Sequence, residues 1–362
     1  MMATDRAIEP FLDVGAAARM GGALARRHSL PTSYRPGALQ AQLTELSIVA
    51  QARVAVEAGL DPPGAPTARV LDRGEWVAAN VRSVDRLLAP AMARASKRSR
   101  IRPPKAIERI GRQSSAVQLG AVLAWMSTKV LGQYDILVGD APGVDEDVIS
   151  YVGPNIVALE QRHGFDPEQF RLWLALHETA HRAQFTGAPW VRPYFLGLVD
   201  EVVSTVNADP AAVLGGLLRS ARELTQGTNP LAEVGAVGLI ASDAQLEALR
   251  RLSALMSVLE GHGEVVMDVA AQDLVPDARR FHEVLRQRRA SPGAAQKVLG
   301  SVLGLDAKLR QYEDGERFVR ALRDAGGASM VRRLFDGPSS LPTMAEVTDP
   351  AAWLTRMVPV GR

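Results

Sequence analysis

The chain has 362 residues, of which 47% are hydrophobic and 23% charged, and it contains no cysteine. This apolar fraction is enough to bury a sizeable core, and it excludes a wholly disordered chain. Because cysteine is absent, disulfides and cysteine-ligated zinc sites are excluded, so a metal site would have to use His, Asp or Glu.

The formal net charge of +2 is close to neutral, so it argues neither for nor against a nucleic-acid partner. The most basic stretch, KRSRIRPPK at 97–105, is short and has no interleaved aromatic residue, which is typical of a solvated loop. We therefore expect no nucleic-acid partner. No apolar run is long enough to span a bilayer, and the N-terminal stretch does not resemble a signal peptide. We expect a cytoplasmic protein without membrane contact.

Helical periodicity dominates the first part of the chain and predicts helices over residues 37–60, 73–95 and 106–132. The segments DILVG (135–139) and VISYV (148–152) are rich in Val and Ile and are bounded by Gly, Asp and Pro. They predict two short strands in a small sheet or hairpin.

From Pro154 onward the pattern is almost entirely helical. The predicted fold class is therefore mainly α with a small β element (α+β). A boundary near residue 104 would separate an N-terminal helical region, 1–104, from a second domain, 105–362, and one continuous domain is the alternative.

The helix of greatest interest starts after Asp166, a good N-cap, with Pro167 in the first helical position and Gln169 where a capping-box partner belongs. It contains LHETAH, which places His177 and His181 four residues apart and therefore on one face. Two imidazoles at this spacing can reach one tetrahedral metal.

Glu178 follows the first of these histidines, about 100° round the helix, from where it can hydrogen-bond a metal-bound water. This is the H-E-x-x-H pattern of zinc hydrolases. Histidine is scarce, with six in the chain, and a capped apolar helix with two of them in phase favours a metal site over a chance pair.

A catalytic zinc needs a third protein ligand. The longer pattern with a third His on the same segment is excluded, because positions 184 and 187 hold Gln184 and Gly187 instead of Gly and His. The ligand would then be a carboxylate from a second helix or one of the other histidines. These are His28, His163, His262 and His282.

Residues 242–272 offer such a helix, opening with a capping-box signature at Ser242 and Gln245. Within an apolar sequence it places Glu260, Glu264 and Asp268 on one stripe. Carboxylates in apolar surroundings are costly to bury without a cation or hydrogen-bond partners, and a metal would supply the cation.

Either glutamate of this stripe fits the third position. If Glu260 binds the metal, Glu264 can accept the second N–H of a ligating His, and if Glu264 binds, Asp268 takes that part. Gly261 and Gly263 weaken the helix by about 1 kcal/mol each relative to Ala. They therefore indicate that another group approaches the backbone closely there.

The two helices together resemble the gluzincin branch of zinc metallopeptidases, in which the third ligand is a glutamate followed one turn later by a carboxylate. EGHGE at 260–264 matches that order, with His262 in the usual aromatic place and Leu259 where many members have Asn. More closely, the chain is similar to the bacterial type-2 zincin-like family, a group often labelled as associated with biosynthesis of a deazaflavin coenzyme.

The segments that carry the closer resemblance keep their order over roughly residues 70–357. They are VLGQYDILV (130–138), YVGPNI (151–156), LHETAHRAQFTGAPWVRPY (176–194), LMSVLEGHGEVVMD (255–268), LGLDAKLRQYEDGERFV (303–319) and LPTMAEVTDPAAWLTR (341–356). The resemblance implies a zincin-like metallopeptidase fold, to which the chain adds an N-terminal helical bundle. It does not supply a substrate.

The resemblance implies one Zn²⁺ per chain, held by His177, His181 and Glu260, with Glu178 as general base and Glu264 and Asp268 as outer-shell groups. The expected activity is zinc-dependent hydrolysis of a peptide or amide. A donor to the oxyanion is also needed, with Tyr312 as the first choice, and His262 and Tyr194 after it.

Two alternatives stay open. The chain could be a non-catalytic zinc-binding protein with a structural or ligand-sensing role, or a metal-free helical scaffold with a chance motif. The oligomeric state does not follow from the sequence.

Overall fold

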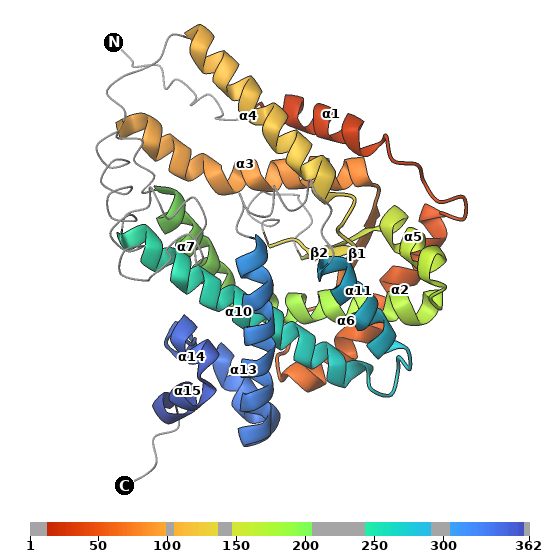
Figure 1. The fold of residues 1–362 in the computed structure, drawn as a ribbon, viewed down its shortest axis with the longest axis vertical. Coiled ribbons are helices and arrows are strands. Elements are labelled where there is room, and N and C mark those ends of the chain that lie inside the picture. Colours follow the sequence, from red (N-terminus) through yellow and green to blue (C-terminus); the bar gives the residue numbers. More distant parts are fainter. Residues whose placement is uncertain (1–12, 99–104, 137–146, 205–242, 291–304, 358–362) are drawn as a thin grey trace. The chain divides into compact units, whose positions relative to one another are not determined.

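A computed structural model describes residues 13–98, 105–136, 147–204, 243–290 and 305–357 of the chain (Figure 1). The predicted fold class is confirmed, because these residues form mainly helices and one small sheet. They divide into two compact units, residues 1–44 with 67–164 and residues 45–66 with 165–362. The predicted boundary near residue 104 lies within the first unit, between its helices α3 and α4.

The first unit combines a helical bundle with the sheet. Its elements are α1 (Val14–Ala25), the start of α2 (Pro36–Ala58), β1 (Thr67–Leu71), α3 (Arg73–Arg98), α4 (Lys105–Met126), β2 (Gly132–Tyr134), β3 (Val148–Val152) and α5 (Gly153–His163). The predicted helices 37–60 and 73–95 are therefore present. The helix predicted over 106–132 ends at Met126 because the chain then turns into β2.

In the bundle, α1 packs on both α3 and α4. The approach to α4 is close because glycines face each other: a Cβ added to Gly21 would lie 2.7 Å from the carbonyl oxygen of Gly120. The core beneath contains the fully buried side chains of Trp76, Val77 and Val81 from one face of α3. Their 76, 77, 81 spacing is that of a helical stripe turned toward its neighbours.

The sheet has the order β1-β3-β2, with β3 parallel to β1 and antiparallel to β2. The strand predicted at 148–152 is present and is buried along its length, as its Val- and Ile-rich composition indicates. The strand predicted at 135–139 lies earlier, at 132–134, and residues 137–139 are outside the described part. The sequence pattern missed β1, because its pairing partner β3 is distant in the chain and parallel pairing leaves no hairpin turn signal.

The outer edge of β1 is covered by a side chain. The amide of Gln40 on α2 donates to the Ala68 carbonyl at 2.8 Å and accepts from the Val70 N–H at 2.8 Å. It thus reproduces the two hydrogen bonds of a neighbouring strand, which satisfies an edge that would otherwise be open to pairing with another chain.

The second unit is helical in its described residues and is organised around α10. It contains the end of α2, α6 (Pro167–Thr186), α7 (Val191–Ser204), α10 (Asp243–Ala271), α11 (Ala278–Ala290), α13 (Leu305–Arg332), the 3-10 turns η2 (Arg333–Phe335) and η3 (Pro338–Ser340), α14 (Met344–Thr348) and α15 (Pro350–Met357). Helix α10 packs against α6, α7, α13 and α14. An aromatic cluster of Phe165, Phe170, Trp173 and Phe281 joins the start of α6 to α11.

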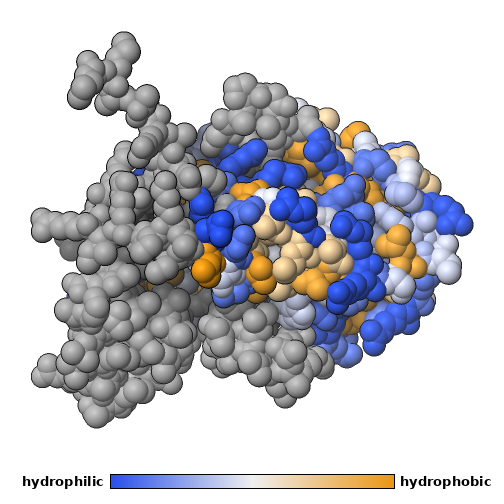
Figure 2. All heavy atoms as spheres, turned by 90° about the horizontal axis from the view of Figure 1, so that it is seen from above, coloured by the Kyte–Doolittle hydropathy of each residue, from blue (hydrophilic) through white to orange (hydrophobic). Residues whose placement is uncertain are grey.

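Figure 2 shows hydrophilic and hydrophobic residues interspersed over the described part of one face. In the parts of the chain that the structure describes, no helix combines the length and the hydropathy that a membrane span requires.

Candidate metal centre

Helix α6 begins and ends where local chemistry predicts. The Asp166 side chain accepts from the Gln169 N–H at 2.9 Å, Pro167 is the first helical residue, and the Gly187 N–H closes the last turn on the Ala183 carbonyl. The expected reciprocal capping box is not formed. The Gln169 side chain instead accepts from the Asp277 N–H at 3.1 Å, so it joins α6 to the start of α11.

His177 and His181 lie one turn apart on α6, with their Nε2 atoms 3.2 Å apart. Glu260 of α10 brings a carboxylate oxygen to 4.0 Å from Nε2 of His181. One ligand atom from each of the three residues lies within 4.8 Å of the other two. The structure thus brings together the three residues that the sequence analysis assigned to a metal.

This donor set fits a zinc ion. Zinc binds imidazole nitrogen at about 2.0–2.1 Å in tetrahedral geometry, which puts two such nitrogens about 3.3 Å apart. The 3.2 Å between the histidines matches that spacing. The 4.0 Å between the Glu260 carboxylate and Nε2 of His181 can shorten by rotation of the Glu260 side chain, which is 30% exposed and therefore has room to move. Three protein ligands of this kind leave a fourth position for water or substrate.

The second nitrogen of His181 is held by a residue that the sequence analysis used only to exclude a longer motif. Gln184 is fully buried, and its side-chain oxygen lies 3.1 Å from Nδ1 of His181. Its amide nitrogen donates to the Leu259 carbonyl at 2.7 Å, which assigns the oxygen to the His181 side. His181 therefore carries its proton on Nδ1, and Nε2 presents a lone pair to the metal position.

His262 completes this network from α10. The Gln184 amide also reaches Nδ1 of His262 at 3.0 Å, where the imidazole must accept. Burial, with a contribution from the neighbouring His181, lowers the pKa of His262 to about 3. The ring is therefore neutral at physiological pH, and it packs edge-on against Phe335 with ring centroids 4.7 Å apart.

Glycines allow α10 to come close to its neighbours at this point, as the sequence indicated. A Cβ on Gly263 would lie 3.2 Å from Cε1 of His181. A Cβ on Gly261 would collide with the backbone of Gly315 and lie 2.6 Å from the Glu316 nitrogen, both on α13. The missing side chains thus let α10 carry Glu260 up to the histidines while α13 supports it from behind.

The other two acids of the α10 stripe, Glu264 and Asp268, each pair with a basic side chain of another helix. Glu264 accepts from Nδ1 of His282 at 2.9 Å, and this hydrogen bond, outweighing burial, raises the pKa of His282. Asp268 pairs with Arg320, and burial raises the pKa of Asp268 in spite of that pair. Glu264, Asp268 and His282 also have ligand atoms within 4.8 Å of one another, but the Arg320 guanidinium already supplies a cation there.

The other residues that the sequence suggested for catalysis or metal binding lie at the following positions in the structure. Glu178 is buried beside His177 on α6, at 5% exposure. Tyr194 lies on α7 and packs edge-on against Trp190. The side chain of Tyr312 is outside the described residues. Two histidines weighed as ligands, His28 and His163, belong to the first unit.

Arg182 is a further buried charge that the sequence analysis did not single out. It follows His181 on α6 and is fully buried. Its guanidinium donates to the Gln51 side chain and to the Pro63 carbonyl, the latter at 2.6 Å, so it ties the metal-binding helix to the 59–66 loop. Nothing in the local sequence separates it from an exposed arginine.

Comparisons with known proteins identify the family of the chain. A family model described as zincin-like metallopeptidase matches residues 12–354. A solved structure from Chloroflexus aurantiacus, described as a candidate hydrolase with a novel fold, aligns with a TM-score of 0.69 at 26% identity, over 97% of this chain and 100% of that one. A comparison with curated proteins gave no match. The chain belongs to the zincin-like metallopeptidase family.

Proposed function

We propose that the chain is a zinc-dependent hydrolase that cleaves a peptide or another amide, with one Zn²⁺ held by His177, His181 and Glu260. The observation that carries the proposal is the 3.2 Å separation of the two Nε2 atoms, with a carboxylate oxygen 4.0 Å from one of them. Membership of a metallopeptidase family supports hydrolysis as the reaction class.

When bound, zinc would lower the pKa of a coordinated water and polarise the carbonyl under attack. The protein's own groups would then handle protons and orientation. Glu178, adjacent to His177 and buried, would accept the proton of the attacking water and pass it to the leaving nitrogen. Gln184 would keep His181 in the tautomer whose Nε2 can bind metal.

The donor to the oxyanion is assigned on the sequence alone. Tyr312 is the first choice, and its side chain lies outside the described residues. His262 offers only Nε2 for donation, because Nδ1 accepts from Gln184. That Nε2 is buried, and it has no hydrogen-bond partner in the part of the chain that the structure describes. We further propose a cytoplasmic location, with neither nucleic acid nor membrane as partner.

The test combines metal analysis with Glu178→Gln. Purified wild-type protein should contain or take up one zinc per chain, and it should cleave members of a peptide library. Glu178→Gln should keep the zinc and lower the cleavage rate by about 100-fold or more, the usual contribution of a general base. Glu168→Gln, an exposed residue in the first turn of the same helix, is the matched control and should keep both zinc and activity.

The outcomes separate the alternatives. A wild-type protein that takes up no stoichiometric zinc would overturn the metal site. Zinc binding without cleavage of any library member, in wild type and variant alike, would favour the non-catalytic zinc protein. Full activity in Glu178→Gln would show that Glu178 is not the general base, and it would not contradict the metal site.

A further inference from the structure

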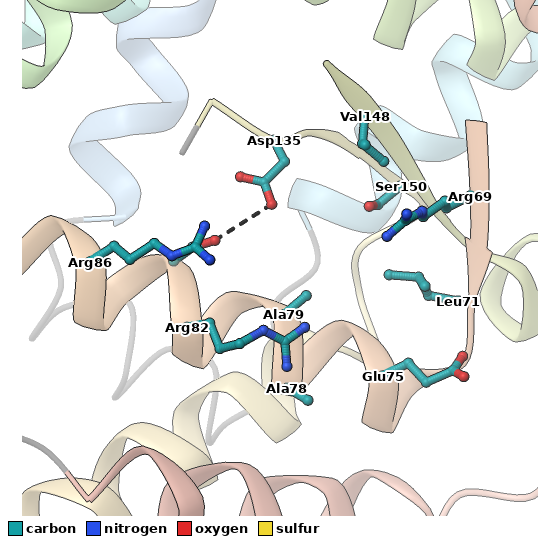
Figure 3. A pocket seen from close by; sticks show the side chains of 11 residues that line it. Arg69, Leu71, Glu75, Ala78, Ala79, Arg82, Arg86, Asp135, Val148 and Ser150 are labelled. Carbon is teal, nitrogen blue, oxygen red and sulfur yellow. Dashed lines mark hydrogen bonds between the residues drawn. The ribbon is translucent and has the colours of Figure 1, made fainter. Parts of the chain in front are cut away.

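A cavity of about 360 Å³ lies in the first unit, between α3 and the sheet (Figure 3). The helix contributes Arg82, Ser83 and Arg86, and the strands contribute Arg69 and Ser150, with Asp135 just after β2. None of these residues belongs to the metal centre, which is built in the second unit. The cavity and the metal centre therefore have no residue in common.

Two arginines of the cavity gather positive charge on its helix side. Arg82 and Arg86 are one helical turn apart on α3, a spacing at which like charges repel. Among the described residues, neither side chain forms a hydrogen bond or an ion pair. Figure 3 shows both guanidinium groups extending from the helix toward the space in front of the sheet, with that of Arg69 opposite them.

Both carboxylates of the lining already accept a hydrogen bond from the protein. The Glu75 side chain accepts from the Asp72 N–H at 2.7 Å and so caps the start of α3. Asp135 accepts from the Ser83 hydroxyl at 3.5 Å. Both carboxylates thus already accept hydrogen bonds, whereas the Arg82 and Arg86 side chains have no partner among the described residues. These two arginines are therefore suited to an additional anionic group.

The walls also leave room for more than an ion. Ala78 and Ala79 line the helix side with methyl groups only, and Leu71 and Val148 add apolar surface from the sheet. A volume near 360 Å³ corresponds to about a dozen waters and lies within the range of small-molecule sites. The Ser150 hydroxyl, which makes no hydrogen bond to described residues, adds a polar contact.

We propose that this cavity binds a small organic molecule through a single carboxylate or phosphate group held by Arg82 and Arg86. Guanidinium groups bind either oxyanion with paired, charge-assisted hydrogen bonds. The neighbouring Arg69 adds charge from the opposite wall, and the small apolar residues take the rest of the molecule. This inference does not rest on the proposed metal chemistry.

Calorimetric titration of the full chain tests it with two probes, 4-hydroxybutyrate for the carboxylate and glycerol 3-phosphate for the phosphate. Glycerol is the neutral probe. At least one anion should bind with a Kd of about 1 mM or tighter, while glycerol does not bind. Whichever anion binds more tightly identifies the headgroup. Failure of both anions to bind at that level would overturn the proposal.

The variants locate the binding. Arg82→Gln/Arg86→Gln should weaken it by about tenfold or more per arginine, because each removes hydrogen bonds to a charged group. Arg82→Lys/Arg86→Lys should weaken it less, since charge remains without the paired geometry. Arg19→Gln/Arg109→Gln, two exposed arginines of the same unit outside the cavity, removes the same charge and should leave binding unchanged.

Thermal unfolding distinguishes lost contacts from lost structure. Without ligand, the double Gln variant should have a Tm equal to or above that of wild type, because it removes a like-charge pair. The bound anion should raise the Tm of wild type and not that of the variant. Unchanged affinity in the double Gln variant, or an equal loss in the control pair, would refute the site.

Discussion

Gln184 accepts a hydrogen bond from Nδ1 of His181 at 3.1 Å, three residues earlier on the same helix. The same amide donates to Leu259 and His262 of α10, so one fully buried side chain connects the two helices that carry the candidate ligands. The orientation of His181 is therefore coupled to the packing of α6 against α10.

The first prediction follows from this coupling. Gln184→Ala should weaken zinc binding by about 10–100-fold, as removal of a metal ligand's outer hydrogen-bond partner usually does. It should also lower the free energy of unfolding by about 1–3 kcal/mol, because buried groups of Leu259 and His262 lose their partner. Zinc competition with a chelating dye and urea unfolding measure the two effects.

Gln169→Ala is the matched control, since this glutamine also joins α6 to another element by a side-chain hydrogen bond, at the far end of the helix from the histidines. It should lower stability without changing zinc affinity. Equal zinc affinities in wild type and Gln184→Ala would show that the network does not act on the metal site.

The second prediction separates the two glutamates of α10. Glu260 faces His181, whereas Glu264 accepts from His282. Glu260→Gln should therefore reduce zinc affinity by more than about 100-fold, and Glu264→Gln by less, in the range of an outer-shell change. Glu247→Gln, exposed on the same helix, serves as the control. A larger loss at Glu264 would reverse the assignment of the third ligand.

The third prediction concerns pH. The hydrogen bond to Glu264 raises the pKa of His282 above its ordinary value of 6.5, so the protonated imidazolium is favoured in the folded state. Its contribution to stability is fully present below pH 6.5 and is lost as pH rises through the folded-state pKa. The stability difference between wild type and Glu264→Gln should therefore be larger at pH 6 than at pH 9.

An NMR titration of the His282 ring tests the cause directly. Its midpoint should lie above 6.5 in wild type and should fall in Glu264→Gln. A midpoint at or below 6.5 in the wild-type protein would contradict the assigned hydrogen bond.

The fourth prediction tests the close approach of α10 and α13. Gly261→Ala should lower the free energy of unfolding by about 3 kcal/mol or more, because a Cβ there would overlap the backbone of Gly315. Gly197 lies on α7, and no other described element comes within 4 Å of a carbon added there. Gly197→Ala should therefore stabilise the fold by about 0.5–1 kcal/mol through helix propensity. Chemical denaturation of both variants measures their free energies of unfolding. An unchanged free energy in Gly261→Ala would show that α10 and α13 can move apart at little cost.

Much of the candidate site could be predicted from the sequence because its signals are local. The Asp166 cap, the in-phase pair His177 and His181, and the acidic stripe of α10 depend only on spacing along a helix. The close approach at Gly261 and Gly263 was likewise indicated by two helix-weakening residues only two positions apart. The helical character of the chain followed from the same periodicity.

Tertiary structure decided the rest. Which glutamate faces the histidines depends on how α10 is rotated against α6, and that rotation is set by contacts such as Gly263 on His181, distant in sequence. The strand β1 exists only through pairing with β3, and the arginine cavity forms only where that sheet meets α3. Gln184 acquires its role only where His181, Leu259 and His262 converge on it. Spacing along one helix determines which residues share a face, whereas packing between elements determines what that face meets.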